Sequence, residues 1–151
     1  LMNDVLSDET RQPFLIFSLE DNLIGICGVC SIHHNQAELD TMMRGVRNGS
    51  PTIMYGAQLI LIDWIFNVLN IDNIVGKVLS KNVLVRHFHK KFGFNEINAS
   101  PLVKEVTSDG YVYRVDPASE VSDETLITIG LERDKFYTRF KTQFHITKNT
   151  G

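Results

Sequence analysis

The sequence has little of what marks several large classes of protein. Its two cysteines, Cys27 and Cys30, form a single CxxC pair, and without a second pair the four ligands of a structural zinc site are missing. The longest apolar run, Leu59–Ile62, is far shorter than the roughly 20 residues that span a membrane. No signal peptide is visible, which favours the cytoplasm. The formal net charge of −3 argues against a general nucleic-acid binder.

The composition suits one globular domain. Of the 151 residues, 43% are hydrophobic and 22% are charged, as is usual for soluble domains with a buried core. We expect a single domain over residues 1–141, followed by a polar tail over residues 142–151. Since the chain starts at Leu1 rather than at a methionine, we also expect some N-terminal residues to be absent from it.

Hydrophobic alternation predicts the strands. Residues 13–32 have the pattern of a hairpin around the turn-forming Glu20-Asp21-Asn22. Further strands are predicted over residues 37–44, 72–79, 111–115 and 126–137, with loops over residues 100–110 and 116–125. Cys27 and Cys30 fall in the hairpin, where side chains three residues apart point to opposite faces. Structural cysteines are therefore the favoured interpretation, and a redox pair is the weaker one.

Two segments have helical patterns. Residues 52–70 are apolar around most of the helix circumference, which predicts a helix that is packed on most sides. Residues 80–94 predict an amphipathic helix with Ser80 as N-cap and Gly93 as C-terminal stop. The apolar stripe of this second helix consists of Leu84, Val85, Phe88 and Phe92. The order of elements predicts an α/β (α+β) fold, in which a mixed sheet is covered by these two helices.

The loop Arg47–Thr52 has the composition of an anion site. It joins a predicted strand to a helix N-terminus, where the first N–H groups lack intrahelical partners and the helix dipole is positive. Arg47 can add a charge-assisted hydrogen bond. The small or polar residues of the loop are Asn48, Gly49, Ser50 and Thr52. The alternative is an ordinary helix start with good capping residues.

The segment WIFNVLNIDNIVGKVLSKNVLVRHFHKKFGF resembles the second half of a GNAT N-acetyltransferase domain. The loop before it is similar to the family's pyrophosphate loop, Q/R-x-x-G-x-G/A, with Ser50 and Thr52 in place of the two glycines. Asn82 stands eleven residues before Gly93, as the family's asparagine does. The resemblance covers about residues 14–94, and DWIFNVLNIDNI is similar to the subgroup of ribosomal-protein and amino-sugar acetyltransferases.

This resemblance implies an enzyme that uses acetyl-CoA or another short acyl-CoA and has a splayed sheet. The third strand would diverge from the strand that follows the first helix, and the acyl-CoA would lie in the gap. Its pantetheine would bond to the backbone near Thr41, Met42 and Met43 like an extra strand. The N–H near Met42 would polarise the thioester carbonyl, and the pyrophosphate would lie on Arg47–Thr52.

The resemblance also implies roles for polar side chains. An amine that attacks the thioester directly must lose a proton, and Glu38 is the candidate base, with Asp40 and His34 as further candidates. His89 takes the position of the family's tyrosine and would protonate the leaving thiolate. Asn82 would contact the pantetheine or orient its helix. The alternative for the carboxylates is a solvated side chain on an edge strand. For His89 the alternative is a half-buried polar residue on its helix, and for Asn82 it is a second cap residue.

Two functions remain open from the sequence. The first is N-acyl transfer to a primary amine, which would be an amino sugar, another small amine or a protein N-terminus. The second is a non-catalytic module that binds acyl-CoA or a protein partner, favoured by the glycine-poor loop and by the lack of the family's first strand and two early helices before Phe14. We expect no metal, nucleic-acid or membrane partner. A homodimer stays open, and the insertion over residues 97–124 would close the acceptor side or meet a second subunit.

Overall fold

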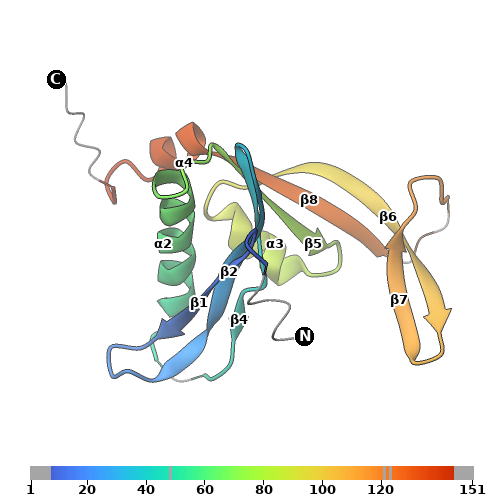
Figure 1. Cartoon of the computed structure of the whole chain (residues 1–151), viewed down its shortest axis with the longest axis horizontal. Helices are drawn as coiled ribbons and strands as arrows, with labels where there is room; N and C mark the ends of the chain where they lie inside the picture. Colours follow the sequence, from blue (N-terminus) through green and yellow to red (C-terminus); the bar gives the residue numbers. More distant parts are fainter. Residues whose placement is uncertain (1–7, 48, 121, 123, 145–151) are drawn as a thin grey trace. The chain divides into compact units, whose positions relative to one another are not determined.

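The computed structural model describes residues 8–47, 49–120, 122 and 124–144, which form a mixed α+β fold (Figure 1). The strands are β1 Gln12–Phe17, β2 Leu23–His33, β3 Gln36–Leu39, β4 Met43–Arg44, β5 Asn73–Leu79, β6 Asn95–Thr107, β7 Gly110–Val115 and β8 Glu124–Glu132. The helices are α2 Ile53–Asn67, α3 Val83–Lys90 and α4 Arg133–Arg139. The described chain divides into two compact units. The first runs to Val75 and includes Glu132–Asp134, and the second comprises the rest.

The first unit begins with the hairpin that the sequence predicts. β1 pairs antiparallel with β2, from Gln12 opposite Val29 to Phe17 opposite Leu23. The connecting turn is closed by the Ser18 N–H, which donates to the Asn22 carbonyl at 2.9 Å. The hairpin prediction is thereby confirmed, and it places both cysteines on β2.

The predicted third strand, residues 37–44, is interrupted, so this prediction is wrong in detail. Val29 of β2 pairs with Leu39, the last residue of β3. Ile26 of β2 pairs with Met43, the first residue of β4. Between these pairs, two residues of β2 oppose the three residues Asp40–Met42, which is the geometry of a β-bulge. After the extra residue, the side chains of β4 point to the opposite faces of the sheet from those that a continuous alternation from β3 would give. The sequence alternates without a break, so it does not reveal this change.

β3 is an interior strand of the first unit. It lies between β2 and β5 and pairs with β5 in parallel, from Gln36 opposite Asn73 to Glu38 opposite Val75. The chain then continues through the bulge into β4, which pairs with β2. The sheet is therefore splayed after Glu38. Because Glu38 does not lie on an edge strand, its interpretation as a solvated carboxylate of an edge strand is wrong.

Helix α2 begins one residue later than predicted and ends at Asn67 instead of residue 70. Its buried residues are Gln58, Leu61, Ile62, Ile65 and Phe66. Ile60 has 69% of its surface exposed, but it and Asn67 are the only exposed residues of α2. The other residues are buried or half-buried, so the prediction of a helix that is packed on most sides is confirmed.

The second unit contains an antiparallel arrangement in the order β5–β8–β6–β7. β6 pairs with β8 from Asn95 opposite Gly130 to Leu102 opposite Glu124, and with β7 as far as Thr107 opposite Gly110. Residues 100–107 are therefore strand, and the prediction of a loop over 100–110 is wrong. From Lys104 to Thr107 the side chains are exposed on both faces, so the alternation of buried apolar and exposed polar residues that predicts a strand is absent there.

A third helix, α4, replaces the second half of the predicted strand over residues 126–137. Phe136 and Phe140 lie four residues apart, as on one face of a helix, and both are buried. Their rings are 4.9 Å apart, and the ring of Phe140 lies 6.4 Å from that of Phe92. This aromatic cluster selects the helix, although the preceding residues continue the alternating pattern of β8.

The core of each unit consists of its buried apolar side chains. In the first unit these include Ile24, Val29, Ala37, Leu61, Ile62, Ile65, Phe66, Ile71 and Ile74, and in the second Phe92, Phe94, Leu102, Ile127, Ile129, Leu131, Phe136 and Phe140. Leu84 of α3 was predicted to face such a core, but 85% of its surface is exposed. Gly93 has a φ of +98°, which confirms it as the stop after α3.

Candidate functional site

The segment from β3 to the start of α2 holds most of the predicted cofactor residues. The bulge removes Thr41 and Met42 from the ladder with β2, while Met43 returns to it. The return is tight, since a Cβ at Gly25 would lie 2.2 Å from the Met43 carbonyl oxygen. Asp40 anchors the bulge: its N–H donates to the Gly28 carbonyl at 2.9 Å. The backbone of Thr41 and Met42 is thus held in place without being part of the β2 ladder.

The predicted phosphate loop follows directly. Arg44 fixes its first half, because its Nε donates to the Val46 carbonyl at 2.9 Å and its Nη2 to the Arg47 carbonyl at 3.1 Å. Gly49 has a φ of +87°, a conformation that favours glycine at this position. Arg47 and Gly49 are exposed, and Asn48 lies outside the described residues. The loop is therefore a braced turn with an accessible outer surface.

The N-terminus of α2 is not closed by a side chain. Thr52 is its N-cap residue, but the Thr52 hydroxyl makes no capping hydrogen bond. It lies 2.8 Å from the Ser50 hydroxyl, which also accepts from the Thr52 N–H at 3.2 Å. No acidic residue is present in the first turn. The first turn of α2 therefore contains no negative side chain that would neutralise the positive end of the helix dipole. An anion site requires this.

The three candidate bases lie at different places in the first unit. Glu38 is half-buried on the interior strand β3, where its backbone pairs with that of Cys30 and of Val75. Asp40 forms an ion pair with Arg11 at 3.3 Å. His34 is exposed in the turn between β2 and β3. Glu38 is thus the candidate closest in the chain to the point where the sheet splays.

Helix α3 of the second unit carries Asn82 and His89. Asn82 is its N-cap: the side-chain Oδ1 accepts from the Val85 N–H at 3.3 Å. The prediction that Ser80 caps this helix is wrong. The Ser80 hydroxyl donates instead to the carboxylate of Glu124, at the start of β8. The cap reading of Asn82, one of those open from the sequence, matches this geometry.

Glu124 is a buried carboxylate that sequence reasoning missed. It accepts from the Ser80 hydroxyl and from the N–H groups of Lys81 and Thr125, at 3.2 and 3.1 Å. These hydrogen bonds, that of Ser80 foremost, hold the pKa of Glu124 below its ordinary value. The carboxylate ties the segment before α3 to β8 and so positions Asn82. Ser80 and Lys81 lie more than 40 residues before Glu124 in the chain, and no local sequence pattern predicts such a pairing.

His89 is enclosed by aromatic rings on α3 and beyond. Its ring lies 5.7 Å from that of Phe88 and 5.3 Å from that of Phe94. Burial lowers the pKa of His89 from 6.5 to about 4, so its imidazole is neutral at pH 7. Its Nδ1 is buried and has no hydrogen-bond partner among the described residues. An imidazole in this state can donate or accept a hydrogen bond, but only about one molecule in a thousand carries the extra proton at pH 7.

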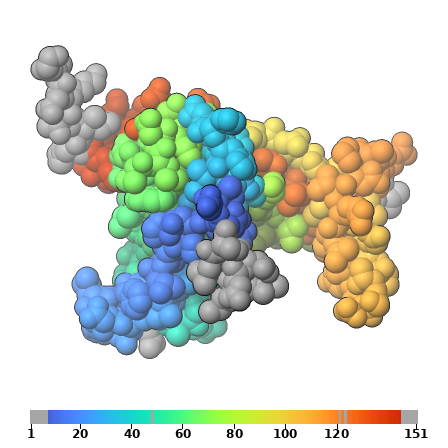
Figure 2. All heavy atoms as spheres, viewed as in Figure 1, coloured from blue at the N-terminus to red at the C-terminus, as the bar shows by residue number. Residues whose placement is uncertain are grey.

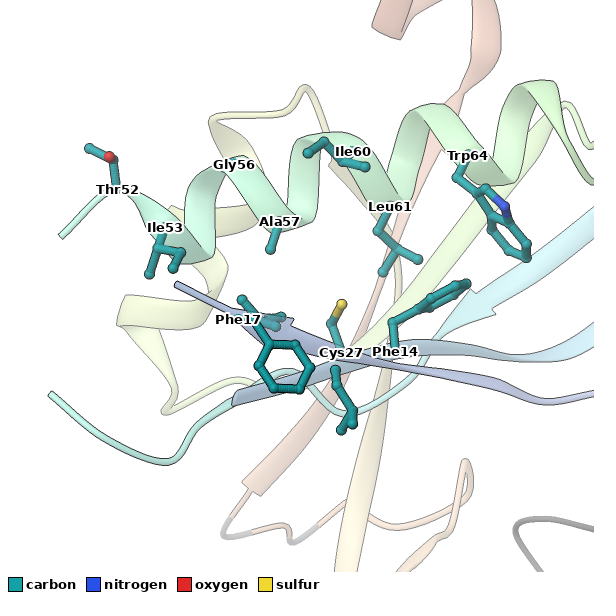
Figure 3. A pocket seen from close by; sticks show the side chains of 12 residues that line it. Phe14, Phe17, Cys27, Thr52, Ile53, Gly56, Ala57, Ile60, Leu61 and Trp64 are labelled. Carbon is teal, nitrogen blue, oxygen red and sulfur yellow. The ribbon is translucent and has the colours of Figure 1, made fainter. Parts of the chain in front are cut away.

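An apolar pocket of about 530 Å³ lies between α2 and the β1–β2 hairpin (Figure 3). Phe14 and Trp64 close one end with ring centroids 4.9 Å apart, and Thr52 lies at the other end. The Cys27 thiol points from β2 toward the helix. Burial raises the pKa of Cys27, and burial together with Asp40 and Glu38 raises that of Cys30. Both cysteines are free, and their raised pKa values disfavour the thiolate that redox chemistry needs.

A second pocket, of about 620 Å³, is polar and belongs to the second unit. It lies where α3 ends and is lined by Lys90, Lys135, Arg139 and Glu96 among others. The Arg139 Nε donates to the Lys91 carbonyl at 2.9 Å and so satisfies an end of α3. These cations complement the negative end of the helix dipole, which accounts for their gathering here.

The described residues hold no group of three or more His, Cys, Asp or Glu side chains that could share a metal ion. None of the described helices is long and apolar enough to cross a membrane. The predicted residues thus form two groups, one in each unit: Thr41–Thr52 with Glu38 in the first, and Asn82 with His89 in the second.

The splayed sheet and the open helix N-terminus fit one family of enzymes, and a comparison of the sequence with protein families gives the same result. The family model of the acetyltransferase (GNAT) domain matches residues 2–95. This is more than half of the chain, which therefore belongs to the GNAT family. The family predicted from the sequence is confirmed, while the subgroup of ribosomal-protein and amino-sugar acetyltransferases stays a prediction.

Solved structures of GNAT enzymes share the fold. One is the spermidine N-acetyltransferase of Vibrio cholerae with CoA and spermine: TM-score 0.68, 17% identity, over 89% of this chain and 72% of that chain. Another is the spermidine/spermine N-acetyltransferase of the same organism with manganese ions: TM-score 0.68, 20% identity, over 91% and 74%. At these identities the likeness shows the fold alone, and it confirms the predicted fold class. Among curated proteins no sequence matches this chain.

Proposed function

We propose that this protein is an N-acyltransferase that moves an acetyl or other short acyl group from acyl-CoA to a primary amine. One observation carries the proposal: a strand leaves its parallel neighbour at Glu38, passes through a bulge, and enters a helix whose N-terminus no side chain caps. Together with membership of the GNAT family, this arrangement supports an acyl-CoA site on the segment from β3 to α2.

The diphosphate of CoA would bind at the loop Arg47–Thr52. The hydroxyls of Ser50 and Thr52 bond to each other without the ligand and can rotate to donate to phosphate oxygens. The α2 dipole and the Arg47 guanidinium add favourable charge. Asn48 completes this set of residues from the sequence. Gly49 keeps the turn open, so that backbone N–H groups reach the ligand.

The pantetheine arm would bond to the backbone at Thr41–Met43. Thr41 and Met42 lie outside the β2 ladder. The Thr41 N–H already donates to the Asp40 Oδ1 at 2.7 Å, so the Thr41 carbonyl and the Met42 peptide groups are the ones suited to an extended ligand that adds as a strand. The Met42 N–H is the candidate donor to the thioester carbonyl, whose oxygen becomes negative as the amine attacks. Because the bulge takes Met42 out of the ladder with β2, the Met42 N–H is not used in pairing with β2.

The chemistry needs a proton to leave the amine and one to reach the thiolate. Glu38 is the proposed base, because a half-buried carboxylate at the splay can accept the amine proton directly or through water. His89 is neutral at pH 7, so we propose that it assists the leaving thiolate as a hydrogen-bond donor rather than as an imidazolium acid. The cap residue Asn82 positions the helix that carries it.

The acceptor is a primary amine. The similar solved enzymes are named for spermidine and spermine, so polyamines join amino sugars and protein N-termini as the candidates. A formal net charge of −3 is compatible with a cationic amine. The second candidate function, a non-catalytic acyl-CoA module, is favoured by the missing loop glycines at Ser50 and Thr52.

Calorimetry with acetyl-CoA tests the site first. We expect Arg47→Ala to weaken binding roughly ten- to 150-fold, which corresponds to the loss of one charge-assisted hydrogen bond of roughly 1.5–3 kcal/mol. Lys141→Ala, which removes an exposed cation near the end of the described chain, is the control and should bind as the unaltered protein does.

A thiol-release assay with an amine panel then separates the two functions. Turnover with any amine supports the enzyme. Tight acetyl-CoA binding with no thiol release across polyamines, amino sugars and peptides supports the non-catalytic module. Absence of acetyl-CoA binding contradicts both.

A further inference from the structure

Strand β7 forms an exposed edge of the second unit. All six residues, Gly110–Val115, are exposed, and among the described strands β7 pairs only with β6. Its outer backbone groups therefore have no partner strand. Such an edge is a template for pairing with another strand.

The ribbon that contains β7 has only two strands. The pairing of β6 with β8 ends at Leu102, so from Val103 to the turn at Gly110 β6 is paired with β7 alone. In Figure 2 the side chains of this ribbon, in orange, stand clear of the rest of their unit. A two-stranded ribbon with no covered face is marginally stable in water, so a covering partner would stabilise it.

The opposite end of the strand order shows how this chain protects an edge that stays open. β1 is the edge strand of the first unit, and it contains Pro13, which cannot donate to an added strand. Its register with β2 also shifts between Ile16 and Phe17. Proline and such irregularities are the devices by which natural edges avoid pairing. β7 has six regular pairs with β6, from Val115 to Gly110, and neither device.

The surface of β7 is mostly apolar, and its one charged side chain is already paired. Tyr111 and Tyr113 lie edge to face, 5.7 Å apart, and the Lys104 ammonium lies 3.9 Å above the Tyr111 ring. The only charged side chain of β7, Arg114, forms an ion pair with Glu105 at 2.8 Å. β7 thus presents aromatic and β-branched side chains with no uncompensated charge, which is the composition that favours strand pairing.

We propose that β7 pairs antiparallel with β7 of a second copy of this chain, about a two-fold axis. In the register that places Val112 opposite Val112 of the partner subunit, Arg114 comes opposite Gly110 instead of another Arg114. Like charges directly opposite each other would destabilise the pair, so charge excludes the register in which Arg114 lies opposite itself. A two-fold interface also needs a self-complementary surface, and a single nearly uncharged strand provides one.

Sedimentation equilibrium of the full chain tests the proposal. We expect a dimer at tens of micromolar, and Val112→Lys should raise the dissociation constant at least about tenfold by placing two like charges near the axis. Leu84→Lys, the same change at an exposed apolar residue of α3, is the control and should leave the dimer intact. Far-UV circular dichroism and the midpoint of thermal unfolding check that both variants are folded. A monomeric unaltered protein, or equal dimerisation of Val112→Lys, overturns the proposal.

Cross-linking tests the register. In a Cys30→Ser background, the variant Val112→Cys should form disulfide-linked dimers with oxidised glutathione, which is reduced as the two thiols, one from each copy, are oxidised. Val106→Cys, an exposed position on β6, is the control, because it lies on the strand away from the proposed axis. Cross-linking of Val112→Cys no greater than that of the control overturns the register and the interface together.

Discussion

The two longer helices, α2 and α3, differ in whether a side chain caps the N-terminus. α2 has 15 residues and five buried side chains, and its N-cap Thr52 makes no capping bond. α3 has eight residues, none of them fully buried, and Asn82 caps it while Gly93 ends it. A helix that is held by its packing can leave its first N–H groups to a ligand, whereas a weakly packed helix needs its own caps. This difference supports the proposal that the anion binds at α2 and that Asn82 positions α3.

The largest predicted effect concerns His89 and acid stability. Its pKa in the folded chain is about 4, against about 6.5 when exposed, so the unfolded chain binds more protons between these values. Stability should therefore rise by about 3 kcal/mol as the pH increases from 4 to 6.5, and fall by the same amount on acidification. Urea unfolding at several pH values measures this change. His89→Gln should flatten the profile and His87→Gln, an exposed neighbour, should not; an unchanged profile in His89→Gln would place His89 in water.

The second largest effect is expected from a negative charge at the uncapped N-terminus of α2. Thr52→Asp supplies α2 with a capping carboxylate in the place where we propose the diphosphate. Acetyl-CoA affinity should fall roughly ten- to thirtyfold, since a charge at a helix terminus contributes up to about 2 kcal/mol. Thermal stability should rise at the same time, by about 0.5–1 kcal/mol. Calorimetry and thermal unfolding measure the two effects, with Thr52→Ser as control; unchanged affinity would show that the anion binds elsewhere.

The smallest effect is expected at the capped helix. Asn82→Ala removes the acceptor for the Val85 N–H and should cost about 1 kcal/mol of unfolding free energy. Asn82→Asp keeps the cap but loses the amide donors. If Asn82 only caps α3, Asn82→Asp retains both stability and acetyl-CoA affinity. Loss of affinity with stability retained would instead give Asn82 a direct contact with the pantetheine.

Much of the fold could be predicted from short stretches of the sequence. The hairpin, β5, the amphipathic character of α3 and the stop at Gly93 all follow from turn residues and short-range periodicity. The bulge at Asp40–Met42 could not, because one extra residue is visible only against the partner strand. The helix α4 follows from the packing of Phe136 on Phe140 and of Phe140 on Phe92, which is more than 40 residues away.

The candidate site divides in the same manner. The loop Arg47–Thr52 and the family were predicted from residue types and spacing, and the family is confirmed. The roles of Glu38, Asn82 and His89 stay predictions. The neutral state of His89 was not foreseen, because burial by Phe88 and Phe94 is a property of the assembled second unit.

The sequence by itself determined the family, the hairpin and the composition of the loop Arg47–Thr52, because each rests on residue types and on their spacing along the chain. Only the tertiary structure decided which helix N-terminus stays open, which histidine is neutral and where Glu124 finds its partners. Those properties depend on desolvation and on hydrogen bonds between distant segments, and neither exists until the chain has folded.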